Sequence, residues 1–185
     1  MTRIALKNTT ILAALLVSSL AVSGAEARHK EKMGTVIAGG RLASATLMTP
    51  DGKTVGSATV LEVSGGLRLT ARIDGLSEGM HGAHVHTVGK CDAPDFASAG
   101  GHWNPGMSKH GSMNPSGPHT GDLPNLVVGK NSKGALGINL PGATFDGLMD
   151  ADGSALVIHA GADDLVTDPS GNSGGRIACG VFVAK

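Results

Sequence analysis

The sequence predicts an all-β fold, an antiparallel sandwich or barrel of seven or eight short strands. Short apolar-rich segments recur along the chain and are separated by turns rich in Gly, Asp and Pro, which is typical of such folds. No segment after residue 27 has a convincing 3.6-residue apolar periodicity, which an amphipathic helix would require. The chain has 185 residues, of which 29 are Gly, and this length suits one domain.

The strands can be assigned in order along the chain. The segment 42–49 ends at Pro50-Asp51-Gly52, a turn in which Pro presets φ and Gly accepts a positive φ. The segment 67–74 alternates apolar and polar residues along its whole length, as a half-buried strand does. The expected strands are 42–49, 53–63, 67–74, 82–88, 126–128, 135–140, 154–160 and 176–184.

The first 27 residues are predicted to be a secretory signal peptide, which leaves residues 28–185 as the mature domain. Arg3 and Lys7 precede an apolar run at 11–22, and Ala25-Glu26-Ala27 matches the small-x-small cleavage pattern. The alternative is an uncleaved membrane anchor, but the run is shorter than the roughly 20 residues that a spanning helix needs. We therefore expect export and no stable membrane insertion.

Composition excludes some classes of partner. The chain has 15 Lys and Arg against 15 Asp and Glu, whereas proteins that bind nucleic acid normally carry a basic excess. It has three Phe, one Trp and no Tyr, so base stacking has little support. We expect an aliphatic core and no nucleic-acid partner.

The two cysteines are interpreted in the light of export. In an oxidising compartment an isolated pair such as Cys91 and Cys179 is expected to form one disulfide. Two buried free thiols are the alternative.

Two long segments, 89–123 and 161–175, interrupt the strands. Both are rich in Gly, Pro, Ser and Asp, and loops of this length inside a domain are usually functional or disordered. The first contains three histidines, which favours function.

Histidines in and around the first loop have the spacing of metal ligands. His84 and His86 lie two apart in an expected strand, so their side chains leave the same face. Three imidazoles and one carboxylate are a suitable set of ligands for a tetrahedral zinc ion. The alternative is a flexible polar loop that merely contains histidines. That loop set is His102, His110, His119 and Asp122.

Other histidines have different expected roles. His159, at the end of a strand, is a plausible further ligand beside His84 and His86, and nitrogen donors suit copper. The seven donors would fill two four-donor sites only if one imidazole bridged both ions. His81 has the opposite strand parity and is expected to be structural, bonded to the backbone. His29 is expected to be solvated.

Five motifs carry a resemblance to a known family. They are MHGAHVH (80–86), GGHWNP (100–105), HTGDL (119–123), VIHAGADD (157–164) and GNSGGRIACGV (171–181). In this order they resemble the copper/zinc superoxide dismutases, and the insert at 92–96 resembles the bacterial exported branch. The resemblance implies a Greek-key β-sandwich or flattened barrel of about eight strands with two long functional loops, an architecture of which this family is a known example.

The resemblance also implies roles for individual residues. Copper is implied at His84, His86, His102 and His159, and zinc at His102, His110, His119 and Asp122, so that His102 bridges both ions. Arg176 and His102 are the implied catalytic residues, Arg176 receiving the substrate anion. Asp163 is implied to orient one copper histidine and one zinc histidine. Cys91 and Cys179 match the family's disulfide.

The implied function is that of an oxidoreductase. It would destroy superoxide anions by copper-dependent disproportionation to dioxygen and hydrogen peroxide, as antioxidant defence in the periplasm. A homodimer is compatible with the resemblance, but the sequence does not distinguish it from a monomer. The alternatives are a copper or zinc buffer without redox chemistry, a zinc hydrolase that uses His84 and His86, and a structural sandwich without metal. Two departures from the usual pattern are Trp103, where Phe is usual, and a second loop without Lys or Arg.

Overall fold

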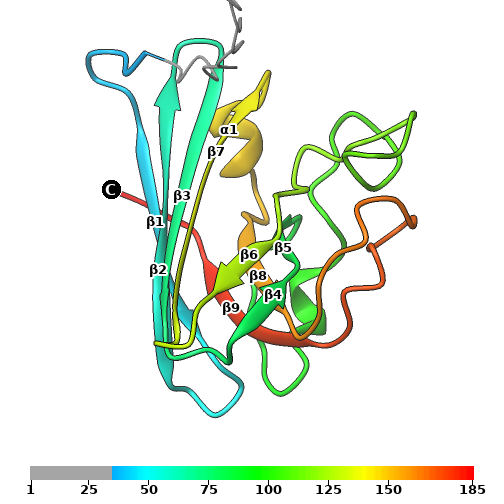
Figure 1. Cartoon of the computed structure of the whole chain (residues 1–185). Helices are drawn as coiled ribbons and strands as arrows, with labels where there is room; N and C mark the ends of the chain where they lie inside the picture. The colour runs from blue at the N-terminus through cyan, green and yellow to red at the C-terminus, as the bar shows by residue number, and fades with distance from the viewer. Residues whose placement is uncertain (1–34) are drawn as a thin grey trace, which may run out of the picture. The chain divides into compact units, whose positions relative to one another are not determined.

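The computed structural model describes residues 35–185, and there the all-β prediction is confirmed (Figure 1). The predicted signal peptide and His29 lie outside the described residues. Within 35–185 no helix is long and apolar enough to cross a membrane. The strands are β1 (Leu42–Met48), β2 (Thr54–Val63), β3 (Gly66–Asp74), β4 (Gly79–His81), β5 (Ala83–His86), β6 (Leu126–Val128), β7 (Lys133–Pro141), β8 (Ala155–His159), β9 (Arg176–Val181) and β10 (Val183–Ala184), and the helices are a 3₁₀ turn η1 (Ala97–Ala99) and α1 (Phe145–Leu148).

All ten strands belong to one antiparallel sheet that curls into a nearly closed barrel. The order is β4-β6-β7-β3-β2-β1-β9-β8-β5, with β10 paired to β1. The two outermost strands, β4 and β5, are consecutive in the chain and are separated by Gly82 alone. The sheet therefore has to bend until its two edges meet. An added Cβ at Gly82 would lie 2.7 Å from Cβ of Ser173, so this joint requires Gly.

Strand assignments from periodicity agree with the structure where the pattern is long. In β3 the side chains of Leu67, Leu69 and Ile73 are at most 3% exposed, and the intervening Arg72 is exposed. The turn at Pro50-Asp51-Gly52 forms as expected, with Gly52 at φ +82° and its N–H donating to Thr49 O at 2.8 Å.

Five short features differ from the expectations. β4, η1 and α1 were not predicted, because three or four residues are too few to show a period. α1 is held by a capping bond, in which the Thr144 side chain accepts from the Gly147 N–H. β5 is shorter than the expected 82–88, and the expected strand 176–184 divides into β9 and β10 at Phe182. The Phe182 N–H donates to Ser154 O and its ring is 2% exposed, so the chain turns inward there.

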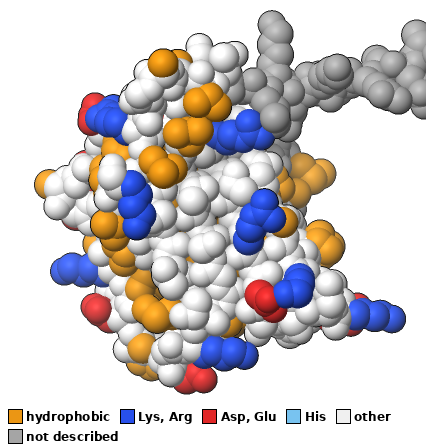
Figure 2. Space-filling view, turned by 90° about the vertical axis from the view of Figure 1, so that its left-hand side faces the viewer, with side chains coloured by type: hydrophobic (Ala, Val, Ile, Leu, Met, Phe, Trp, Pro, Cys, Tyr) orange, Lys and Arg blue, Asp and Glu red, His pale blue; other side chains and the backbone are white. Residues whose placement is uncertain are grey.

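The interior of the barrel is aliphatic, as the composition predicts. Trp103, the residue in the place usual for Phe, is 5% exposed and packs in the same core as Leu47 and Phe145. Gly147 lies beside the indole, and an added Cβ there would be in ordinary van der Waals contact with it, at 3.5 Å. The larger ring is thus accommodated within the core. On the face drawn in Figure 2, basic side chains stand apart from one another and no histidine is visible.

Candidate metal centre

Strand β5 brings the two distant parts of the first loop together. One edge of β5 pairs with β8, and the other forms single bridges at His84↔Asp122 and His86↔His102. Between these bridges, Val85 N donates to Gly121 O at 2.9 Å and Val85 O accepts from Trp103 N at 2.8 Å. Backbone pairing therefore places His102 and Asp122 beside the strand that carries His84 and His86.

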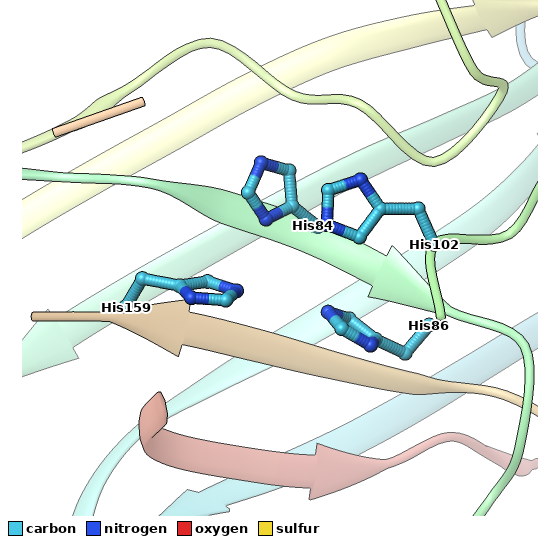
Figure 3. A group of neighbouring side chains, drawn as sticks. All are labelled: His84, His86, His102 and His159. Atoms are coloured by element: carbon cyan, nitrogen blue, oxygen red, sulfur yellow. The ribbon is translucent and has the colours of Figure 1, made fainter. Parts of the chain in front are cut away.

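Four histidine rings converge at this strand (Figure 3). His84 and His86 come from β5, His159 ends β8, and His102 comes from the loop. Their ring centroids are 3.9 Å (His84–His102) to 6.4 Å (His102–His159) apart. One nitrogen of each ring lies within 4.8 Å of the others, as metal donors must. These four residues are called the all-histidine group below.

A second set of donors surrounds the Asp122 carboxylate. Its Oδ1 lies 2.9 Å from His102 Nδ1, 3.0 Å from His110 Nδ1 and 3.2 Å from His119 Nδ1. His119 Nδ1 lies 3.4 Å from His102 Nδ1. Donors at 2.0–2.1 Å from a tetrahedral zinc ion are about 3.3 Å from one another, so this spacing suits zinc. These four residues are called the carboxylate group below, and His102 belongs to both groups.

The ring nitrogens that face the centre of the all-histidine group have no hydrogen-bond partner. They are His84 Nδ1, His86 Nε2, His102 Nε2 and His159 Nε2, all of them buried. His110 Nδ1 in the carboxylate group is also buried and makes no hydrogen bond, although it lies 3.0 Å from Asp122 Oδ1. A buried polar atom without a partner costs roughly 1–3 kcal/mol and calls for an explanation such as a bound ion. Five such atoms in one place fit two metal ions.

Hydrogen bonds on the opposite side of each ring determine which nitrogen is free. His86 Nδ1 faces Gly100 O at 2.9 Å, and His159 Nδ1 faces Gly174 O at 3.0 Å. Carbonyl oxygens only accept hydrogen bonds, so these ring nitrogens carry the hydrogen. The remaining Nε2 of each ring therefore presents a lone pair toward the group, which is the form that binds a metal.

The Asp163 carboxylate is hydrogen-bonded to two histidine rings. Its Oδ2 lies 2.6 Å from His84 Nε2 and its Oδ1 lies 3.0 Å from His110 Nε2. The carboxylate thus joins a histidine of the all-histidine group to one of the carboxylate group. It lies where the resemblance implies an orienting carboxylate.

Burial and hydrogen bonding shift the pKa values of these groups in a consistent direction. Burial lowers the pKa of His84 to about 4 and that of His86 to about 2, because the cation loses its hydration. Burial alone would raise the pKa of Asp122, but bonds from the His102 ring and from the Gly111 and His119 N–H groups hold it well below its usual range. Neutral imidazoles and an ionised carboxylate are the protonation states of metal ligands.

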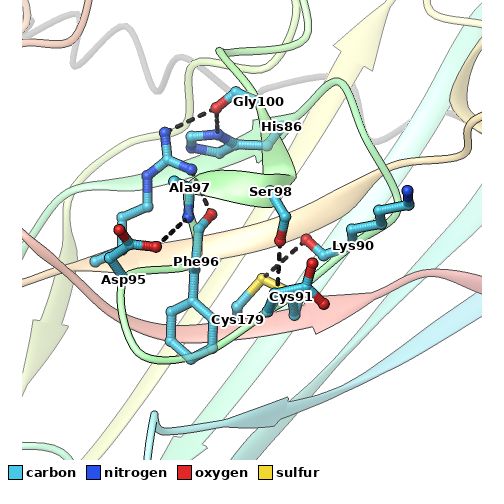
Figure 4. Close-up of a disulfide and its surroundings, with 11 residues drawn as sticks. His86, Lys90, Cys91, Asp95, Phe96, Ala97, Ser98, Gly100 and Cys179 are labelled. Atoms are coloured by element: carbon cyan, nitrogen blue, oxygen red, sulfur yellow. Dashed lines mark hydrogen bonds between the residues drawn. A yellow bond between two sulfur atoms is a disulfide. The ribbon is translucent and has the colours of Figure 1, made fainter.

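Arg176 lies next to the all-histidine group. Its Nη1 donates to Phe96 O at 2.6 Å and its Nη2 donates to Gly100 O at 2.7 Å, the same oxygen that faces His86 (Figure 4). Both carbonyls belong to the segment after Cys91, which is bonded to Cys179 in β9. The predicted disulfide is confirmed, and it ties the segment that holds Arg176 to the barrel.

His81 is bonded to the backbone, as predicted. Its Nδ1 lies 2.8 Å from His159 O and its Nε2 lies 3.1 Å from Ser77 O. Both ring nitrogens face backbone carbonyl oxygens, so neither is directed at the two groups of donors. Its role is structural.

Two residues that support the site were not predicted from the sequence. Gly171 has φ +65°, and an added Cβ there would lie 1.9 Å from Asp163 Oδ1. Asn125 binds the backbone of Asp163 at both ends, donating to its O and accepting from its N–H at 2.8 Å each. Gly171 stands in a quoted motif, which could have drawn attention to it. Asn125 has no comparable signal.

Comparison with known proteins agrees with this geometry. Residues 54–182 match the sequence profile of the family described as copper/zinc superoxide dismutase (SODC). The chain belongs to this family. Superoxide dismutase [Cu-Zn] 1 of Aquifex aeolicus is 40% identical over 143 residues, which cover 74% of this chain and 85% of that relative.

Solved structures of the superoxide dismutase family also resemble the chain. A SOD-like protein from Bacillus subtilis is 41% identical, with a TM-score of 0.72, and the match covers 76% of this chain and 97% of that one. Cu/Zn superoxide dismutase from Brucella abortus is 30% identical, with a TM-score of 0.62, and the match covers 76% and 98%. The Bacillus protein is named only SOD-like, so the fold does not by itself bring the activity, which depends on the residues of the site.

Proposed function

We propose that the protein is a copper/zinc superoxide dismutase. The observation that carries the proposal is the set of buried ring nitrogens without a hydrogen bond, which lie in the all-histidine group and at His110 in the carboxylate group. His102 belongs to both groups, and donor atoms of His84, His102, His110 and Asp122 also lie within 4.8 Å of one another. A relative that lacked these donors could keep the fold without the chemistry. This chain has the complete set.

The two groups of donors suit different ions. The all-histidine group (His84, His86, His102 and His159) offers only nitrogen, and we assign it to copper, which nitrogen donors bind strongly. The carboxylate group (His102, His110, His119 and Asp122) offers three nitrogens and one oxygen at tetrahedral spacing, and we assign it to zinc. Bound copper supplies the one-electron redox chemistry by which two superoxide anions and two protons become dioxygen and hydrogen peroxide.

The chain's own residues prepare the site for an anion and a proton. Arg176 is held by the Phe96 and Gly100 carbonyls, which neutralise none of its charge, so the guanidinium can attract a superoxide anion. His102 presents Nε2 to the all-histidine group while its Nδ1 faces Asp122. Nε2 is the atom at which this ring can take up and return a proton next to the substrate. Asp163 keeps the hydrogen of His84 on Nε2.

The activity can be measured directly. Metal-loaded protein should inhibit the reduction of a dye by superoxide from xanthine oxidase, chelation should abolish the inhibition, and added copper and zinc should restore it. Protein that holds both ions and still gives no inhibition would instead be a metal buffer. The variant His102→Ala removes the shared ring and should be inactive, whereas Arg72→Met, on β3, should have wild-type activity.

Export to the periplasm is part of the proposal. Residues 1–27 have the pattern of a cleaved signal peptide, and the Cys91–Cys179 disulfide fits an oxidising compartment. N-terminal sequencing of protein from the periplasmic fraction should begin at Arg28. The homodimer remains a prediction, which light scattering coupled to size-exclusion chromatography checks.

A further inference from the structure

The two long loops are bonded to each other over the carboxylate group. In Figure 1 their traces run on the same side of the sheet. Met113 N donates to Leu165 O at 3.0 Å, and Asn114 Nδ2 donates to Val166 O at 3.2 Å. Trp103 and the Cys91–Cys179 disulfide anchor the first part of the first loop to the barrel, and these bonds to the second loop hold the part near residues 113 and 114.

Asp163 binds the His110 ring from the second loop, and Asp168, further along the same loop, contacts the backbone of that histidine. Asp168 Oδ1 accepts from the backbone N–H of His110 at 2.8 Å, and Asp168 Oδ2 accepts from Lys109 Nζ at 2.9 Å. The same Oδ1 lies 3.9 Å from Nε2 of His119. One carboxylate from the second loop therefore reaches His110 and His119, the two histidines that belong to the carboxylate group only.

Asp168 binds His110 through the backbone N–H and not through the ring. A charge-assisted bond to a backbone N–H is stronger than a neutral one and fixes the backbone rather than a mobile side chain. By fixing the backbone at His110, this bond fixes the point from which the ring extends.

We propose that Asp168 is a positioning residue for zinc: it fastens the first loop to the second at His110 and so keeps His110 and His119 in place for the ion. The inference rests on the proposed function to the extent that these histidines are zinc ligands. Partners that orient metal ligands typically contribute 10- to 100-fold to metal affinity.

A matched control lies four residues away in the same loop. The Asp164 carboxylate accepts from the N–H groups of Val166 and Thr167 and from Asn172 Nδ2, all within the second loop. Replacing Asp164 therefore removes bonds within the second loop but removes no bond to the first loop. The comparison separates positioning of zinc ligands from general loosening of the loop.

The experiment uses protein loaded with copper and zinc and measures zinc release to a coloured chelator. Asp168→Ala should release zinc about 10- to 100-fold faster than wild type. Asp168→Asn should fall between the two, because its amide oxygen can still accept from the His110 N–H. Lys109→Met should change the rate less than about twofold, because it removes an ion pair whose side chains are 62% and 34% exposed. Asp164→Asn should release zinc at close to the wild-type rate.

A second measurement does not depend on zinc. Hydrogen exchange at the His110 amide in the metal-free protein should be faster in Asp168→Ala than in wild type, and faster in Asp168→Asn than in Asp164→Asn, which carries the same change. Release from Asp168→Ala at the wild-type rate, or equal acceleration in Asp164→Asn, would overturn the inference while leaving the proposed function intact. A wild-type protein that binds no zinc would overturn both.

Discussion

Reduction of the disulfide provides a quantitative test of the fold. Cys91 and Cys179 are 88 residues apart, and closing a loop of that length restricts the unfolded chain by an amount worth about 4.6 kcal/mol at 25 °C. Domains of this size are stabilised by about 5–15 kcal/mol in total. We therefore expect reduction of the metal-free protein to lower its free energy of unfolding by about 4.6 kcal/mol and to leave it marginally stable.

The assay is unfolding in guanidinium chloride, followed by the fluorescence of Trp103, the only tryptophan, which is 5% exposed when folded. Metal-free protein is used so that ions bound to the native state do not add to its stability. The slope of the transition should rise on reduction, because the unfolded chain then exposes more surface. A double variant with Ala at both cysteines should show no redox dependence. A loss below about 2 kcal/mol would refute the argument from loop closure.

Three further predictions concern the site. Gly171→Ala should displace Asp163, because the added Cβ would lie 1.9 Å from its Oδ1, and zinc affinity measured by chelator competition should fall about 10- to 100-fold; wild-type affinity would contradict this. Arg176→Met should slow superoxide turnover about tenfold or more at low ionic strength and less in high salt, as expected from the electrostatic steering known in this family, whereas Arg72→Met should keep the wild-type salt profile. Metal-free protein should lose stability as the pH falls from 6.5 to about 4, because burial lowers the pKa of His84 to about 4 and only the unfolded chain takes up this proton in that window. Urea unfolding at pH 7 and pH 4.5 should show that the free energy of unfolding falls by about 1.4 kcal/mol per pH unit for each such histidine. Equal stability at both pH values would contradict this pH dependence.

Periodicity predicted the strands that are long and half-buried. β3 alternates for its whole length, so sequence alone indicates which side chains face the core. The same rule put His84 and His86 on one face of β5, and the structure shows their rings converging with His102 and His159. Local sequence carries this information because the period of a strand is a local property.

Contacts between loops could not be predicted in the same way. Asp168 meets His110 across 58 residues, and Asn125 meets Asp163 across 38. Such bonds leave no period in the sequence, because each depends on where two irregular segments are placed by the barrel between them. β4 was missed for a related reason: its three residues form a strand only because β6 lies beside them.

Donor types and spacing indicated the two groups of ligands, but not which ring nitrogen is free. That depends on backbone carbonyls such as Gly100 O and Gly174 O, which face the opposite side of the His86 and His159 rings. Every residue has a backbone carbonyl, so no sequence pattern identifies the carbonyls that face a histidine ring. The need for Gly at position 171 likewise follows from the carboxylate that fills the space of its absent side chain.

The most direct test of the central claim is a crystal structure of the metal-loaded protein with anomalous scattering recorded at the copper and zinc absorption edges. We predict one copper ion among the partnerless nitrogens of His84, His86, His102 and His159, one zinc ion at the donors around Asp122, and the His102 ring between them. A single ion, or two ions with no imidazole in common, would contradict the account.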